Sequence, residues 1–306
     1  MDLDGENPEL RALATYYAGK GGALWAAEQA GRVVGMVATK PLGDGAWELC
    51  RMYAAAETRG SGLAQTLIAA AEGHARSHGA TAMKLWTDTR FDRAHRFYEK
   101  CGYLRDGPIR ALDDVSHSIE FAYAKPFAGV VVKRLDAAGA ASAERALAGV
   151  LLACNEADGA ASFLPPLAEP AARAFWRRSA SEVALGQRVL LVAWADGALA
   201  GTVMLDLAMP ANQRHRGEVE RLLVHPGLRR RGIARALMAR VEQEAAAEGR
   251  RLLTLHTGAG GPAEPLCHAM DWREGGRIPG FALNADGTPR AAVIFYKEIA
   301  ARTVAA

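Results

Sequence analysis

Hydrophobic and polar positions recur along this chain in the periods of helices and strands. Near the start, a helical pattern runs from Asn7 to Tyr17, and the glycines between Gly19 and Gly22 end it. Residues 24–28 and 32–39 then alternate around a short turn, which predicts a hairpin. A third strand is predicted over residues 47–54. The opening of the chain therefore reads as a helix followed by three strands.

The first half continues with alternating helices and strands. A loop rich in arginine and glycine leads into a helix that ends at Gly79, and residues 83–86 form the next strand. Because a helix joins this strand to the one before it, the two strands are expected to pair in parallel. This half is completed by a helix at 93–100 and strands at 103–109 and 118–123.

The second half repeats this succession after a longer opening. Its predicted elements are a strand at 130–134, helices at 142–155 and 171–184, a hairpin at 189–195 and 199–208, strands at 252–256, 273–278 and 291–297, and a short helix at 263–270. The first half therefore lacks an opening strand and helix. Another segment is needed to complete its sheet edge, unless the smaller half is natural.

One stretch occurs twice. Residues 218–238 align without a gap on residues 48–68 when the chain is shifted by 170 positions, and the match continues to Leu85 and Leu255. Of these 38 aligned pairs, 11 are identical. A self-match at half the chain length indicates a duplicated domain rather than a solenoid, whose period would be roughly 20 to 50 residues.

The repeated stretch is a strand, an arginine and glycine loop, and a helix. A helix start carries unpaired N–H groups and the positive end of the dipole, so it favours an anion. Arg229 to Arg231 precede this start, and such charges are reasonable there if a polyanion lies over the loop. Gly232 and Ala234 would let it approach the backbone. A solvated basic loop is the alternative interpretation.

The composition restricts the class of protein but does not identify a function. The 306 residues favour two domains, here 1–127 and 128–306, and a net charge of +3 gives no reason to expect nucleic acid. The four cysteines lie far apart without a C-x-x-C pair, and the histidines show no metal-ligand spacing. The polar, acidic start is unlike a signal peptide, and apolar runs are too short for a membrane span. We expect a cytoplasmic protein with no metal, nucleic-acid or membrane partner, as a monomer or homodimer.

The strand, R-x-x-G-x-A loop and helix, with the later sequence RAHRFYEKCGY, resemble the GNAT superfamily of N-acetyltransferases. The resemblance covers nearly the whole chain as two units in tandem. It implies an α/β (α+β) fold in which each unit has a mixed central sheet flanked by helices, with the fourth and fifth of seven strands splayed apart. It also implies acetyl-CoA as cofactor, with its pyrophosphate on the loop N–H groups. The implied coenzyme contacts are Met52, Tyr53, Ala54, Arg59, Gly60, Ser61, Gly62, Leu63 and Ala64 in the first half, and Leu222, Leu223, Val224, Arg229, Arg230, Arg231, Gly232, Ile233 and Ala234 in the second.

The resemblance also assigns candidate catalytic residues. Glu48 and Glu218, at the start of the central strands, match the general base of the family, although either could be an exposed strand carboxylate. Tyr98 matches the tyrosine that protonates the coenzyme A thiolate; its alternative role is packing. Cys267 stands at the matching place in the second half, where a buried structural cysteine is the more common reading.

The second half is more closely similar to the tabtoxin-resistance acetyltransferase subgroup, through FLPPL at 163–167, the stretch 212–238 and IPGFALNADGTPRAAVIFYK at 278–297. That subgroup would have an aspartate where His256 stands and a tyrosine where Cys267 stands. Phe163 to Leu167 and the connection from Ile278 to Pro289 are candidate substrate walls.

These features predict transfer of an acetyl group from acetyl-CoA to a primary amine of a small molecule or peptide. The first half is favoured for acid catalysis and the second for tight coenzyme binding. The alternative is an acyl-CoA-binding sensor or scaffold in which one or both halves are inactive.

Overall fold

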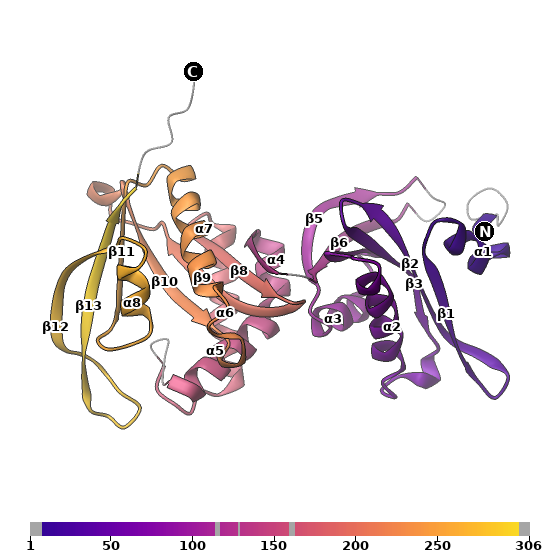
Figure 1. The fold of residues 1–306 in the computed structure, drawn as a ribbon, viewed down its shortest axis with the longest axis horizontal. Helices are drawn as coiled ribbons and strands as arrows, with labels where there is room; N and C mark the ends of the chain where they lie inside the picture. The colour runs from indigo at the N-terminus through magenta and orange to yellow at the C-terminus, as the bar shows by residue number, and fades with distance from the viewer. Residues whose placement is uncertain (1–7, 114–116, 128, 159–162, 300–306) are drawn as a thin grey trace, which may run out of the picture. The chain divides into compact units, whose positions relative to one another are not determined.

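The computed structural model describes residues 8–113, 117–127, 129–158 and 163–299. The chain forms two compact units, Met1–Gly129 and Val130–Ala306, called here the N-terminal and C-terminal units. Each unit contains one mixed sheet flanked by helices (Figure 1). The predicted fold class, a tandem of such α/β units, is confirmed.

The N-terminal unit follows the predicted succession closely. Its elements are η1 (Pro8–Arg11), α1 (Leu13–Gly19), β1 (Ala23–Gln29), β2 (Arg32–Gly43), β3 (Ala46–Ala54), η2 (Ala56–Thr58), α2 (Leu63–Ser77), β4 (Ala82–Asp88), α3 (Asp92–Lys100), β5 (Leu104–Ala111) and β6 (Ile119–Pro126). The expected helix from Asn7 to Tyr17 is instead a 3-10 turn followed by the short helix α1, and Asn7 itself lies outside the described residues.

The C-terminal unit has the longer opening that the sequence predicts. Its elements are β7 (Val130–Leu135), α4 (Ala137–Ser142), α5 (Glu144–Asp158), α6 (Glu169–Ala184), β8 (Arg188–Ala195), β9 (Ala198–Asp206), η3 (Ala211–Gln213), β10 (Arg216–Val224), η4 (Pro226–Leu228), α7 (Ile233–Ala247), β11 (Leu252–Gly258), α8 (Ala263–His268), β12 (Arg273–Leu283) and β13 (Pro289–Glu298). The connection expected from Ile278 to Pro289 is shorter, because β12 continues to Leu283.

The strand orders of the two sheets correspond one to one except at one edge. The N-terminal sheet runs β1-β2-β3-β4-β6-β5, and the C-terminal sheet runs β7-β8-β9-β10-β11-β13-β12. Strand β7 pairs with β8 at the edge of the C-terminal sheet, and the described residues form no corresponding strand beside β1 in the N-terminal sheet. Among the described residues, the N-terminal unit therefore has no opening strand, as predicted, and none of them pairs with the outer edge of β1.

The repeat found in the sequence is also a repeat of structure. The bounds of β3 and β10, of η2 and η4, of α2 and α7, and of β4 and β11 each differ by 170 residues at both ends. The duplicated sequence therefore specifies the same backbone twice, from the central strand to the strand beyond the helix.

A salt bridge shared by both units ties the repeated helix to the sheet. In the N-terminal unit, the Lys125 ammonium donates to both carboxylate oxygens of Glu72, at 2.8 and 2.9 Å. In the C-terminal unit, Lys297 donates to Glu242 at 2.8 Å, and the Trp272 indole donates to the other oxygen of the same carboxylate. Glu72 and Glu242 differ by 170 in number, so each copy fastens its helix to the sheet by the same means.

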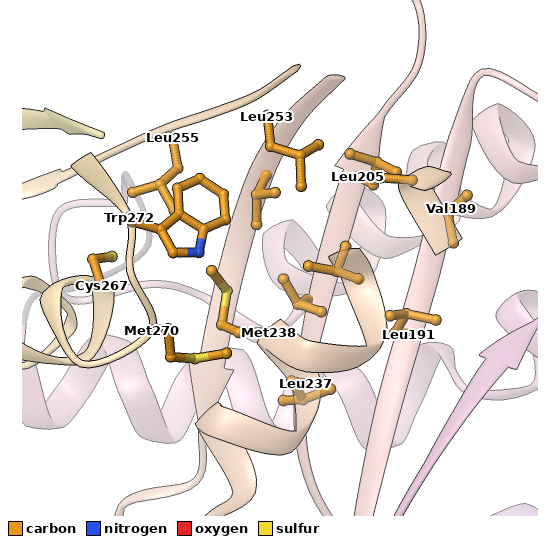
Figure 2. Close-up of a cluster of buried hydrophobic side chains, with 14 of the residues drawn as sticks. Val189, Leu191, Leu205, Leu237, Met238, Leu253, Leu255, Cys267, Met270 and Trp272 are labelled. Carbon is orange, nitrogen blue, oxygen red and sulfur yellow. The ribbon is translucent and has the colours of Figure 1, made fainter. Parts of the chain in front are cut away.

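Strands β8 and β9 of the C-terminal sheet are buried on both faces, which explains the nearly continuous apolar run of β8. One face packs on α7 through Leu237, Met238 and their neighbours, as Figure 2 shows for this cluster of buried side chains. On the opposite face, Leu190 and Trp194 are buried where α5 and α6 cover β8 and β9. The N-terminal unit has the first layer, built on α2, but its described residues form no counterpart of α5 and α6.

The glycine that begins each repeated helix has a backbone conformation that other residues adopt at a cost. Gly62 has φ +85° and a Cβ added there would meet no atom within 4 Å, so backbone strain alone decides the effect of a substitution. We expect Gly62→Ala to destabilise the N-terminal unit by about 1 kcal/mol. Gly73, inside α2 with equally open surroundings, is the matched control: Gly73→Ala should stabilise by about 0.5–1 kcal/mol. Urea unfolding of the full chain measures both, and a shift of the same sign in the two variants would contradict the prediction.

Candidate functional site

In each unit the two central strands separate just after they begin. β10 pairs in parallel with β11 only from Arg216–Leu252 to Glu218–Thr254. β3 and β4 likewise pair only from Ala46–Ala82 to Glu48–Lys84. The strands therefore splay in both units, as expected, and the glutamates predicted as bases occupy the last paired position.

Both central strands bulge three residues beyond the glutamate. Arg51 and Arg221 have positive φ values of 50° and 53°, which is uncommon for arginine, and the pairing with the neighbouring antiparallel strand shifts register there. A bulge adds a residue to one strand and redirects the side chains after it. The residues expected to contact the coenzyme ahead of the loop, Met52 to Ala54 and Leu222 to Val224, follow this bulge.

The loop after each central strand presents unpaired N–H groups. In the C-terminal unit, the N–H groups of residues 232–235 donate to no protein acceptor in the described part of the chain. In the N-terminal unit, Leu63 N–H donates to Ser61 Oγ at 3.3 Å, whereas those of Gly62, Ala64 and Gln65 have no such acceptor. Gly232 (φ +78°) also has open space where a Cβ would stand. These groups fit an anionic ligand such as a pyrophosphate.

Two of the three arginines in the second loop already form ion pairs with carboxylates of the protein. Arg229 donates to both oxygens of Asp158 on α5 and to the Val224 carbonyl, so it fastens the loop to α5. Arg231 pairs with Asp196 at the β8–β9 turn. Within the described residues, Arg230 has no ion pair. The expectation of three arginines held for a polyanion is therefore modified, because two of them already have carboxylate partners.

The two strand glutamates have different neighbours. Glu48 lies 3.1 Å from the Lys40 ammonium on β2, with both side chains largely buried. Glu218 lies 3.7 Å from His256 Nδ1 on β11 and 3.6 Å from the Arg216 guanidinium. The His256 imidazole holds the pKa of the Glu218 carboxyl below its usual range, which partial burial opposes and Arg216 reinforces. Sequence reasoning did not single out Lys40, and it noted His256 only as a departure from the subgroup.

Tyr98 and Cys267 both lie in hydrophobic cores. Tyr98 is 7% exposed and packs near the rings of Tyr103 and Tyr123. Burial, with smaller effects from Cys101 and Tyr53, raises the pKa of its phenol, so the phenol keeps its proton at neutral pH. Cys267 is 1% exposed beside Met270 and Trp272 (Figure 2), and burial raises the pKa of its thiol to about 11. The burial of Cys267 therefore supports its interpretation as a structural cysteine.

Two acidic residues and a histidine also gather where α8 meets the start of β12. Ligand atoms of Glu264, His268 and Glu274 lie within 4.8 Å of one another. Arg277 already donates to both of these carboxylates, so a cation there would have to displace the guanidinium. A hollow of about 610 Å³ lies alongside, lined by residues of the β11–α8 loop and α8: Gly260, Gly261, Pro262, Glu264, Pro265 and His268.

Across the described ranges, none of the helices combines the length and apolar character that a membrane span requires. The Acetyltransferase (GNAT) family matches residues 3–103 and 160–283, which together make up well over half of the chain.

The chain is also similar to several solved structures. A GNAT superfamily phosphinothricin acetyltransferase from Sinorhizobium meliloti, in complex with AcCoA, is 17% identical with a TM-score of 0.48, over 58% of this chain and 92% of that one. A ribosomal-protein-alanine N-acetyltransferase from Brucella melitensis is 19% identical with a TM-score of 0.47, over 55% and 99%. An N-acetyltransferase from Staphylococcus aureus Mu50 is 16% identical with a TM-score of 0.47, over 56% and 99%.

Proposed function

The chain belongs to the GNAT acetyltransferase family, and on this premise we propose that it transfers the acetyl group of acetyl-CoA to a primary amine of a small molecule or peptide. The observation that carries the proposal is the repeated site: a splayed strand pair with a glutamate at the point of separation, followed by a loop with unpaired N–H groups. An acceptor amine and an anionic donor can meet at such a point.

The coenzyme is proposed to bind at both loops. The N–H groups of Gly62 and Ala64, and of Gly232 and Ala234, would hold the pyrophosphate, because an anion there also benefits from the helix dipole. Arg59 and Arg230 add positive charge, since neither has an ion pair among the described residues. The bound coenzyme supplies an activated thioester.

The remaining chemistry is proton transfer and orientation. The amine must lose a proton, and the leaving thiolate must gain one. Glu48 and Glu218 stand where a proton acceptor or its support is needed, and Tyr98 is the proposed donor in the N-terminal unit. Because the thioester is already activated, correct placement of the amine supplies much of the rate.

A second candidate function is acyl-CoA binding without turnover by the N-terminal unit. The observation that favours it is the ion pair between Glu48 and Lys40, because the ammonium 3.1 Å away occupies the carboxylate that the amine would have to approach. The N-terminal unit would then serve as a sensor or scaffold.

Calorimetry and a thiol-release assay test the proposal together. Titration of the full chain with coenzyme A should give two sites per chain, and acetyl-CoA with a panel of alkylamines, amino acids and peptides should release free thiol. Two sites with no release on any amine would reject the enzyme and leave the sensor. No binding at all would reject both.

Tyr98→Phe tests the proposed thiolate donor. The change removes only the hydroxyl and keeps the ring packing, so coenzyme affinity should stay unchanged while turnover of the N-terminal unit falls by roughly 10²-fold. Measuring the variant in a Glu218→Gln background lowers the contribution of the C-terminal unit. An unchanged rate in that background would remove Tyr98 from the mechanism.

Other predictions remain part of this proposal. The likeness of the second half to the tabtoxin-resistance subgroup, the domain assignment 1–127 and 128–306, the cytoplasmic location and the state as monomer or homodimer all rest on the sequence. Size-exclusion chromatography with light scattering tests the last of these.

A further inference from the structure

A carboxylate and an imidazole meet at the splay point of the C-terminal unit. Glu218 Oε1 and His256 Nδ1 are 3.7 Å apart, although the two residues lie on different strands. The other oxygen of Glu218 is 3.6 Å from Arg216, which is itself held by Gln213 and Thr254. The carboxylate is therefore fixed from one side and faces the imidazole on the other.

The strand register places this pair at the opening between the strands. Glu218 pairs with Thr254 in the last parallel pair, and His256 follows two residues later on the same face of β11. Leu253 and Leu255, at the alternate positions of β11, belong to the core cluster that includes α7, so His256 projects from the opposite face of the strand. Its imidazole is 40% exposed, and the Phe281 ring of β12 lies 5.1 Å from it.

We propose that His256 is the proton acceptor for the amine in the C-terminal unit, and that Glu218 is a positioning residue that orients the imidazole and stabilises its protonated form. The inference rests on the proposed acetyl transfer. A neutral imidazole titrates near pH 6.5 in general and can take a proton at neutral pH, whereas an ionised carboxylate with a depressed pKa is a weak base.

At the splay point of the N-terminal unit, the described residues form no such pair, which separates this feature from the shared fold. Trp86 stands at the position of His256, with the Arg110 guanidinium over its ring at 4.0 Å. Glu48 is paired with Lys40 instead. The same backbone therefore carries a carboxylate and an imidazole in one copy, and a carboxylate and an ammonium in the other.

The step balances without a further reactant. The amine gives its proton to His256 Nε2, its lone pair forms the new C–N bond to the acetyl carbon, and the C–S bond breaks. The sulfur leaves with the bonding pair and takes up a proton from solvent. The products are the N-acetyl amine and free coenzyme A, and His256 returns its proton to solvent.

The experiment follows thiol release by the full chain from pH 5.5 to 9.5 in a Glu48→Gln/Tyr98→Phe background, which removes the groups proposed for the N-terminal unit. We expect His256→Gln to lower kcat/KM by roughly 10²-fold and to abolish the rise of kcat/KM with pH that the titration of a histidine base produces. Coenzyme A affinity should not change. His215→Gln, an exposed histidine of the same unit, should match the background.

Glu218→Gln separates positioning from a merely structural role. Loss of the carboxylate removes the stabilisation of the imidazolium, so the inflection should move to lower pH while the plateau falls. The other titratable or charged groups facing this place are Arg216 of β10, Asp206, which pairs with Glu218 from β9, and Tyr296, which pairs with Thr254 from β13. None of them is changed in these variants.

The outcomes separate the two proposals. If the wild type binds coenzyme A but acetylates no amine, the proposed function fails. If the wild type is active but His256→Gln keeps the rate and pH profile of its background, or if the background itself has no activity, the role of His256 is overturned. An inflection that stays in place in Glu218→Gln overturns the role of Glu218.

Discussion

Replacing Ala234 with glutamate is expected to remove one of two coenzyme sites without unfolding the protein. Ala234 is the second residue of α7, where the preceding Gly232 begins the helix with a left-handed backbone. A carboxylate in the first turn is favourable for the helix itself because it meets the positive end of the dipole. The same charge repels a pyrophosphate held by the neighbouring N–H groups.

The expected loss of affinity is large. Two like charges about 4 Å apart repel by about 4 kcal/mol at an effective dielectric constant of about 20, which corresponds to a loss of roughly 10³-fold. Calorimetry with coenzyme A should therefore show one site in Ala234→Glu, one in Ala64→Glu and none in the double variant. Thermal unfolding should stay within about 0.5 kcal/mol of the wild type.

The repeat supplies matched controls for this experiment. Ala239 and Ala69 are exposed, lie on α7 and α2 beyond the first turn, and differ by 170 in number. Ala239→Glu and Ala69→Glu add the same charge to the same helices away from the loops, and both sites should survive. A loss of binding in the controls, or two intact sites in the double variant, would contradict the placement of the coenzyme.

The repeat also shows why so much of the fold could be predicted from the sequence. The 170-residue shift aligns positions whose backbone is strongly constrained, such as Gly62 and Gly232, both with positive φ. It also aligns Arg51 with Arg221, where both copies have the same unusual bulge. Local patterns of this kind specify local structure, so strands and helices of the repeat fell where periodicity placed them.

The chemistry of the site was harder to predict from the sequence, because it depends on contacts between segments that are far apart along the chain. Glu218 and His256 are brought together only by the parallel pairing of β10 and β11. Counting two residues beyond the partner of Glu218 on the following strand would have indicated the pair. No local pattern predicts that Asp158 and Asp196 pair with the loop arginines. Asp158 belongs to α5, which has no counterpart among the described residues of the first copy, and Asp196 lies at the turn between β8 and β9.

The Glu72–Lys125 pair was missed for another reason. The gap-free match ends at Leu85 and Leu255, and the two lysines that pair with the helix glutamates, Lys125 and Lys297, are 172 rather than 170 residues apart. The strand pairing restores their equivalence, since Lys125 pairs with Met83 and Lys297 with Leu253. A charged pair repeated in both cores indicates a common energetic role.

Removing one partner of that pair is expected to destabilise the N-terminal unit strongly. The Glu72 and Lys125 side chains are only 11% and 13% exposed, so Glu72→Leu leaves an ammonium partly buried without its carboxylate. Breaking a buried pair in this way costs about 3 kcal/mol. Urea unfolding of the full chain, followed through the transition of the N-terminal unit, should report this loss.

The double variant Glu72→Leu/Lys125→Met decides what the pair contributes. Replacing both partners by apolar side chains of similar volume removes the desolvation cost together with the attraction, so it should recover most of the lost stability. Glu57→Leu, which removes an exposed carboxylate of the same unit, should change the free energy of unfolding by no more than about 0.5 kcal/mol. If the double variant is as unstable as Glu72→Leu, the pair itself holds α2 on the sheet. If it recovers, the duplicated fold needs the volume of these side chains, and the charges serve to fix the register of helix on sheet.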